Sequence, residues 1–269
     1  EISCSLVGSE MCIRDRYRID WEKLEQQLAD PQTTLMILCN PQNPAGNIWD
    51  CETLARIGAL CKQYDVIVVS DEIHCDLTKP GTEYIPFASV DDTCRDISVT
   101  CIAPTKTFNL AGLQTAAVYA ENSILHHRMW RRLNTDEVAE PNAFAIQATI
   151  AAFQYGEEWL DELREYVEKN KQYVTEFLQE KIPLIHPVAG DATYLMWLDC
   201  RKITESGRQF AKFIRKTSGL YVSGGNQYGK GGEGFLRVNV ATSKLVVEDG
   251  MQRLYESVDA WLKEEKISK

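Results

Sequence analysis

A repeated order of short apolar strand and helix is the feature that most constrains how this chain can fold. Residues 33–39 and 66–70 are almost wholly apolar, and residues 51–64 between them are helical in character. Asp50 can accept hydrogen bonds from the first amides of that helix, as Asp20 can for residues 21–28, so both predict a helix start. Strands linked through helices are typical of a mostly parallel sheet, whose ligands bind at the carboxyl ends of the strands.

The rest of the chain extends this pattern and then departs from it. Residues 97–102 and 115–120 predict two more strands, whereas residues 159–178 repeat apolar side chains every three to four positions and predict one long helix. We therefore predict an α/β fold, with a mostly parallel sheet carrying helices on both faces in a partial large domain and a smaller C-terminal α+β domain. The large domain is expected at 17–155, and the interdomain helix with the small domain at 156–269. The small domain should contain strands at 193–198, 220–223 and 235–240 and helices near 208–216 and 246–263.

Two segments are predicted to lack regular structure. Residues 1–16 show neither helical nor strand periodicity and resemble a translated sequencing adapter. We expect this segment to be non-native and to contribute no folded element. The glycine-rich residues 224–234 predict a flexible loop, because no helix follows them that would favour phosphate binding.

The acidic composition excludes several classes of partner. The chain has 29 Lys and Arg against 39 Asp and Glu, a net charge of −10, so no basic surface for nucleic acid or membrane is expected. No apolar run reaches the roughly 20 residues of a spanning helix, and Glu1 to Arg16 lacks the order of a signal peptide, which favours a cytoplasmic location. Nine cysteines without a Cys-x-x-Cys pair argue against a metal site and against a disulfide framework.

Two ionisable residues follow neighbouring apolar strands. Lys106 lies in a turn-forming segment, residues 103–113, and a lone amine placed there is a candidate Schiff-base nucleophile. Asp71 ends the apolar run 66–70, where an unpaired carboxylate would be costly to bury, so a cationic partner is expected. The alternatives are a solvated surface lysine and a helix N-cap aspartate.

Two further polar residues stand in constrained places. Asn43 lies between Pro41 and Pro44, which favours an extended backbone and a rigidly presented amide, although ordinary turn chemistry is the alternative. Arg237 lies in the apolar strand 235–240, where a guanidinium indicates an anionic partner such as a carboxylate bound by two parallel hydrogen bonds. An ion pair that bridges two domains is the alternative for Arg237.

Taken in order, these segments resemble a known family. The runs Asn40-Pro-Gln-Asn-Pro-Ala-Gly46, Val66 to His74 and Ala103 to Leu113 resemble the pyridoxal-phosphate enzymes of the aspartate aminotransferase superfamily. The Asp-Glu-Ile-His-Cys-Asp and Thr-Phe-Asn-Leu-Ala-Gly runs resemble more narrowly its cystathionine β-lyase, or C–S lyase, branch. The resemblance covers residues 17–269 and implies that the chain lacks the N-terminal third of such an enzyme, including parts of the phosphate site and of a homodimer interface.

The resemblance implies roles for the candidate residues. Lys106 would form an imine with pyridoxal 5'-phosphate and later take the α-proton of the substrate. Asp71 would pair with the pyridinium nitrogen, and Asn43 would donate to the phenolic oxygen of the ring. Arg237 would bind the α-carboxylate of an amino-acid substrate.

Other positions are implied with departures from the superfamily pattern. His74 stands where aminotransferases usually carry tyrosine, and it would tune the cofactor rather than move protons; this difference favours the lyase. Thr105 would help to hold the phosphate. Ala103 and Gln114 stand where a phosphate-binding hydroxyl and an arginine are common, so fewer phosphate donors are expected.

The implied activity is β-elimination on cystathionine or cysteine S-conjugates, which gives a thiol, pyruvate and ammonia. One alternative is a class I/II aminotransferase, because both reactions begin from the same carbanion. A third interpretation is a non-enzymatic or inactive fragment, and on this resemblance the chain alone is expected to bind the cofactor weakly.

Overall fold

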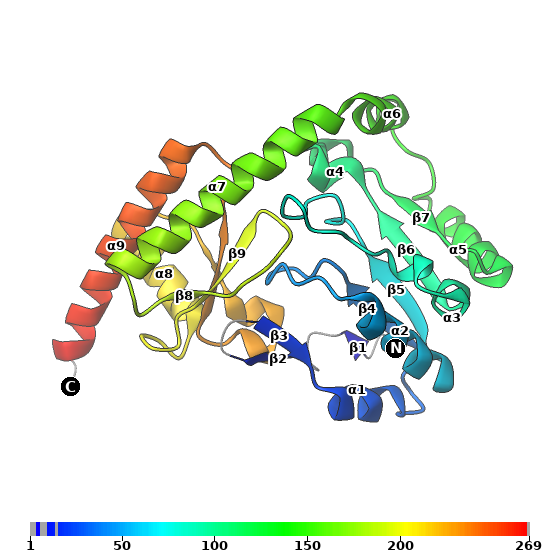
Figure 1. The fold of residues 1–269 in the computed structure, drawn as a ribbon, viewed down its shortest axis with the longest axis horizontal. Helices are drawn as coiled ribbons and strands as arrows, with labels where there is room; N and C mark the ends of the chain where they lie inside the picture. Colours follow the sequence, from blue (N-terminus) through cyan, green and yellow to red (C-terminus); the bar gives the residue numbers. More distant parts are fainter. Residues whose placement is uncertain (1–3, 6–9, 14–15, 268–269) are drawn as a thin grey trace.

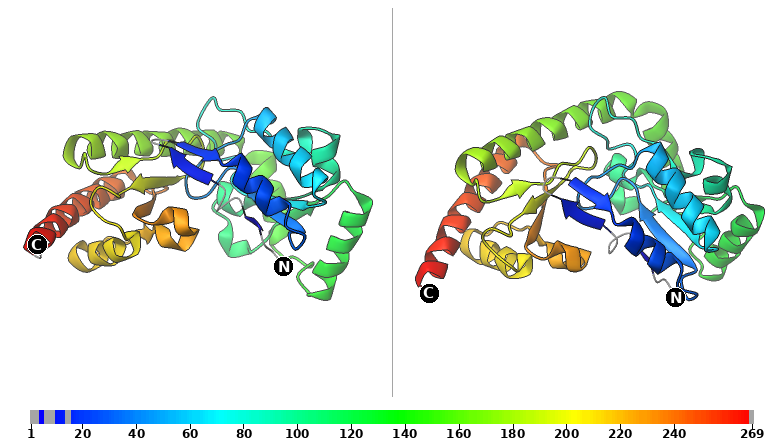
Figure 2. Two further views of the ribbon diagram at one scale, coloured as in Figure 1. Left: turned by 90° about the horizontal axis from the view of Figure 1, so that it is seen from below. Right: turned by 60° about the horizontal axis from the view of Figure 1, so that its bottom comes forward.

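The computed structural model describes residues 4–5, 10–13 and 16–267. Two sheets lie side by side, and one long helix, α7 (Glu157–Lys181), runs from the first toward the second (Figures 1 and 2). We call the parts built around them the parallel-sheet unit and the antiparallel-sheet unit. The α/β class predicted from the sequence is confirmed, and the predicted domain bounds remain predictions.

The parallel-sheet unit contains five strands in the order β1-β4-β5-β6-β7. All neighbouring pairs are parallel except β6 with β7, which is antiparallel. The four strands predicted between residues 33 and 120 are confirmed with slightly shifted bounds. The strands are β1 (Cys4–Ser5), β4 (Leu35–Cys39), β5 (Ile67–Asp71), β6 (Ser98–Ile102) and β7 (Ala117–Tyr119).

One face of this sheet packs on α1 (Trp21–Leu28) and α2 (Cys51–Gln63). Met36, Leu38 and Val68 are fully buried in that core, whereas alternate residues of β4 and β5 are only half-buried. Alternation of this kind is what a strand with one well-covered face requires.

Local capping fixes where these two helices begin. The Asp20 carboxylate accepts from the Lys23 amide at 3.1 Å, and the Asp50 carboxylate accepts from the Thr53 amide at 2.8 Å. Both predicted N-caps are therefore confirmed. The Asp50 hydrogen bonds also lower the pKa of its carboxyl group.

The expectation that residues 1–16 contribute no folded element is wrong in the parts that the structure describes, and their non-native character remains a prediction. β1 pairs in parallel with β4, and β2 (Glu10–Ile13) pairs with β3 (Arg16–Ile19) in an antiparallel ladder. Strand pairing uses backbone groups, so such short strands need no apolar alternation in their sequence. The other residues of this segment lie outside the described part of the chain.

The antiparallel-sheet unit contains four strands in the order β10-β11-β9-β8. Helices α7, α8 (Gly207–Ser218) and α9 (Lys244–Ile267) cover it, and Phe210 and Leu198 are fully buried at the centre of the shared core. The predicted helices and the strands at 193–198 and 235–240 are confirmed with small shifts, whereas the strand predicted at 220–223 is wrong except at Ser223, where β10 begins. The strands are β8 (His186–Pro187), β9 (Leu195–Asp199), β10 (Ser223–Gly224) and β11 (Phe235–Asn239).

Shorter helices complete the fold. The segment predicted as a flexible loop forms two short 3-10 turns, η3 (Gly225–Tyr228) and η4 (Lys230–Gly232). Helix α5 (Ser123–Thr135) was not predicted, and it buries none of its residues. Among the described residues, no helix is both long enough and apolar enough to span a membrane. The remaining helices are η1 (Phe87–Ser89), α3 (Asp92–Asp96), α4 (Pro104–Thr107), η2 (Ala111–Leu113) and α6 (Ala145–Tyr155).

Candidate active site

Three neighbouring parallel strands deliver candidate residues to one edge of the sheet. The loop that carries Asn43 follows β4, Asp71 is the last residue of β5, and Lys106 lies in α4 directly after β6. The register pairs Asp71 with Cys39 on one side and with Cys101 on the other, so the three strands end level with one another. This is the edge at which open α/β sheets bind ligands.

Arg237 reaches the same edge from the antiparallel-sheet unit. Its Nη1 donates to the Asn43 side-chain oxygen at 3.2 Å, although the two residues are far apart in the sequence. Its guanidinium also lies 5.1 Å from the centre of the Tyr228 ring, within reach of a cation–π interaction. Arg237 thus bridges the two units through a neutral amide, which leaves its positive charge available to an anion.

The residues that follow Asn43 are held by the second unit. The amides of Asp191 and Ala192 both donate to the Gly46 carbonyl, at 2.9 and 3.1 Å. Gly46 has a φ of +72°, and a Cβ at this position would lie 2.5 Å from the Ala192 oxygen. Only glycine fits there, because both the backbone conformation and the close approach exclude a side chain. The Lys171 ammonium donates to the same Ala192 oxygen at 3.0 Å and secures the contact.

His74 is buried and feels the charges of the two cationic residues of the site. Burial lowers the pKa of His74 to about 4, with further contributions from the charges of Lys106 and Arg237. The ring is therefore neutral at neutral pH. It makes an edge-on contact with the Tyr194 ring at a centroid distance of 5.9 Å, and its Nδ1 finds no hydrogen-bond partner among the described residues.

Asp71 is half-buried and its local bonds are weak. One carboxylate oxygen accepts from the Ile73 amide at 3.3 Å, and the other accepts from the Cys39 thiol at 3.9 Å. Turns rather than a helix follow it, so the structure does not support the N-cap alternative. The adjacent Glu72 is different: it is buried, it accepts from the Ser70 hydroxyl and the Phe87 amide, and burial raises its pKa.

Lys106 and Thr105 occupy the single turn of α4, and both are half-buried. The Thr107 hydroxyl donates to Asp76 at 2.9 Å, which ties this turn to the loop that follows β5. Ala103 begins the turn without a side-chain cap, as its methyl group requires. The structure thus places Lys106 near His74, and the role of Thr105 remains a prediction.

The cysteines near this edge are poor nucleophiles. Burial raises the pKa of the Cys75 thiol to about 12 and also raises the pKa of Cys101. Cys75 and Cys101 are both free cysteines. These two thiols therefore serve as packing groups rather than as reactive ones.

Tyr194, Tyr228 and Lys171 were not predicted from the sequence. Tyr194 follows a long-range bridge between Thr78 and Ala192, which no local pattern signals. Tyr228 is an aromatic residue inside a glycine-rich run, and that isolation is the one sequence signal that could have indicated it.

Comparison with known proteins defines the class. The aminotransferase class I and II model matches residues 3–254, so the chain belongs to this family. Cystathionine β-lyase PatB of Bacillus subtilis is 43% identical over 88% of this chain and 62% of its own length. These findings confirm the resemblance inferred from the motifs.

Solved structures agree with this similarity. Cystalysin from Treponema denticola, whose structure contains a pyridoxal 5'-phosphate cofactor, is 28% identical with a TM-score of 0.90, over 93% of this chain and 64% of that one. The PLP-bound C–S lyase from Staphylococcus hominis is 32% identical with a TM-score of 0.84, over 93% and 63%. The chain spans slightly less than two thirds of the length of these relatives.

Proposed function

We propose that this chain carries the catalytic centre of a pyridoxal-phosphate-dependent C–S lyase. The substrate class is cystathionine or another cysteine S-conjugate, which reacts with water to give a thiol, pyruvate and ammonia. The observation that carries the proposal is the convergence of Asn43, Asp71 and Lys106 at one sheet edge, with Arg237 reaching across from the second unit. The C–S lyases and the cystathionine β-lyase among the relatives support it.

The residues at this edge fit the cofactor. Lys106 would attach it covalently, Asp71 would face the pyridine nitrogen, Asn43 would meet the ring oxygen, and Thr105 would contribute to the phosphate site. The unpartnered and buried Nδ1 of His74 is a polar atom that a ligand group can satisfy. When bound, the cofactor supplies an electron sink that stabilises negative charge at the substrate Cα.

The side chains of this chain then divide the work. Arg237 binds the substrate α-carboxylate through its planar fork, with Asn43 holding one of its nitrogens in place. Lys106 Nζ takes the proton from the substrate Cα as general base. His74 stays neutral, so it adds no positive charge beside Arg237 and the substrate carboxylate.

Pyruvate formation tests the proposal directly. With pyridoxal phosphate and cystathionine, the protein should release pyruvate, and Lys106→Ala should abolish this release. Borohydride reduction followed by peptide mapping should place the cofactor on Lys106, with the half-buried Lys171 as the internal control. Exchange of amino and keto acids without pyruvate would identify an aminotransferase, and cofactor attached to another lysine would refute the site.

A homodimer and a cytoplasmic location are part of the same proposal. Apolar side chains are exposed on α5 and α6, among them Trp130, Phe144 and Ile146, and a second copy of the chain would cover them. Free thiols such as those described here are typical of a reducing compartment. Analytical ultracentrifugation showing a monomer at micromolar concentration would contradict the dimer, and fractionation into an oxidising compartment would contradict the location.

A further inference from the structure

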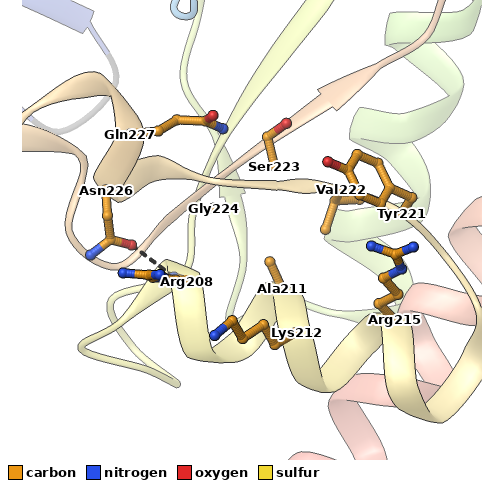
Figure 3. Close-up of a pocket in the computed structure, with 10 residues that line it drawn as sticks. All are labelled: Arg208, Ala211, Lys212, Arg215, Tyr221, Val222, Ser223, Gly224, Asn226 and Gln227. Carbon is orange, nitrogen blue, oxygen red and sulfur yellow. Dashed lines mark hydrogen bonds between the residues drawn. The ribbon is translucent and has the colours of Figure 1, made fainter.

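A cavity of about 470 Å³ lies in the antiparallel-sheet unit, between α8 and the segment that leads into β10 (Figure 3). It differs in its lining residues from the sheet edge described above. Three cations, Arg208, Lys212 and Arg215, project toward it from one side of α8, and Tyr221 lies across from them. Among the residues that the structure describes, no Asp or Glu lines this cavity.

The spacing of the three cations sets the size of the group they can bind. They stand at positions i, i+4 and i+7, which places them on one face of the helix. At about 1.5 Å per residue they span about 10 Å along the axis. That length suits two linked anionic groups better than one.

Comparison with α9 shows that the cations of α8 differ from those of an ordinary solvent-exposed helix. On α9, Lys244, Arg253 and Lys263 each pair with a carboxylate one turn away. α8 contains no Asp or Glu, and none of the ion pairs among the described residues involves its three cavity cations. The chain as a whole carries a net charge of −10, so an uncompensated cluster of three cations stands out.

The other lining groups are placed by their own contacts. The Asn226 side-chain oxygen accepts from the Arg208 amide at 2.7 Å, which holds this wall against the start of α8. Its amide nitrogen donates to the Glu233 carboxylate. The Arg215 guanidinium lies 5.1 Å from the centre of the Tyr221 ring, and that ring is 71% exposed, which leaves aromatic surface open for stacking.

We propose that this cavity binds a nucleoside diphosphate. The two phosphates lie along Arg208, Lys212 and Arg215 in charge-assisted hydrogen bonds, and the base stacks on Tyr221. The cavity shares no lining residue with the proposed cofactor site, although Ser223 of its wall pairs with Arg237 across β10 and β11. The proposed binding does not depend on the lyase activity.

Isothermal titration with ADP tests this proposal on the whole chain, saturated with pyridoxal phosphate. Lys212→Ala and Arg208→Ala should each weaken ADP binding by about 10-fold or more, since each removes a charged hydrogen-bond donor. Lys216→Ala is the matched control, because Lys216 is an exposed cation of the same helix that does not line the cavity. It should change the affinity by less than about 2-fold, as expected of a distant surface charge. These side chains are exposed, so the variants should fold, and circular dichroism checks that they do.

Ligand variation separates the phosphate contacts from the stacking. AMP and inorganic pyrophosphate should bind more weakly than ADP, and Tyr221→Ala should reduce ADP binding without reducing pyrophosphate binding. The proposal is overturned if ADP does not bind, if adenosine binds as tightly as ADP, or if Lys216→Ala weakens binding as much as Lys212→Ala. Loss of ADP binding on addition of pyridoxal phosphate would assign it to the sheet edge and would equally overturn the proposal.

Discussion

The two units of the molecule differ in how many residues of their outer helices are buried. α8 buries Phe210 and Ile214, and α9 buries Met251 and Leu254, all against the antiparallel sheet. α5 buries none of its residues and α6 buries only Ala145. Their apolar side chains therefore face away from any core in the described chain.

The comparison shows which helices have their apolar side chains covered within one copy of the chain and which do not. The antiparallel-sheet unit buries most of the apolar side chains of α8 and α9 in its own core, with Leu245 and Val246 at the start of α9 exposed. In contrast, α5 and α6 present an apolar surface that one copy of the chain leaves uncovered. The same division holds for the site. Lys106, Asp71 and His74 come from the parallel-sheet unit, and the second unit supplies Arg237 for recognition.

Paired alanine substitutions sharpen the comparison most. Phe210→Ala should lower the free energy of unfolding by about 3–5 kcal/mol, because the ring is fully buried and a cavity would remain. Phe144→Ala, at the 75% exposed N-cap of α6, should change the free energy of unfolding by less than about 0.5 kcal/mol and should instead weaken self-association. Urea unfolding and ultracentrifugation measure the two effects. Equal destabilisation by both variants would contradict the difference in burial between the two units.

Asp71→Asn tests whether the parallel-sheet unit supplies the residues that carry out the chemical step. The amide keeps the shape and can still accept from the Ile73 amide, but the charge is lost. We expect the rate constant kcat to fall by about 10²–10³-fold, as for removal of one preorganised electrostatic group. Glu72→Gln is the matched control, since its buried carboxyl bonds to Ser70 and Phe87 and should affect kcat far less. A near-normal rate for Asp71→Asn would assign Asp71 a structural role.

The sequence predicted the features that depend on residues close together in the chain, such as helix starts and strands. The Asp20 and Asp50 caps lie within three residues of the amides they bind, so their positions follow from the sequence alone. The strand runs and the residues that follow them were likewise readable, because a parallel sheet brings consecutive strand ends to one edge. α5 was missed although Leu125, Met129 and Leu133 recur every four positions, the pattern that identifies a helix, and its burial of no residue could not be read from the sequence.

Contacts between the units could not be predicted in this way. The bond from Arg237 to Asn43 joins residues from different sheets, and Lys171 meets Ala192 only because α7 crosses that loop. Gly46 is an example. The sequence indicated that it lies in a turn, but the close approach of the Ala192 oxygen, which excludes a side chain there, depends on how the second unit packs.

Lys171 offers a pH test of the contact between the units. Burial lowers its pKa from 10.5 to about 8, so between pH 8 and pH 10.5 the folded protein binds fewer protons than the unfolded chain. Stability relative to Lys171→Met should therefore rise with pH across this window, by up to about 3 kcal/mol. Chemical unfolding at several pH values measures the difference. Lys169→Met, at an exposed position of the same helix, should show no such rise, and a flat profile for Lys171→Met would contradict the buried charge.

Arg237→Ala tests whether the second unit contributes recognition rather than chemistry. The variant should raise KM about 10–100-fold, since it removes a charge-assisted pair of hydrogen bonds to the substrate carboxylate. Arg237→Lys keeps the charge but loses the planar fork, so it should recover only part of the affinity. Loss of this cation should also raise the pKa of His74, which an NMR titration of the ring follows without any turnover. If the His74 pKa rises while KM stays unchanged, Arg237 lies where the structure places it but the carboxylate binds elsewhere, and the bond to Asn43 is then its function.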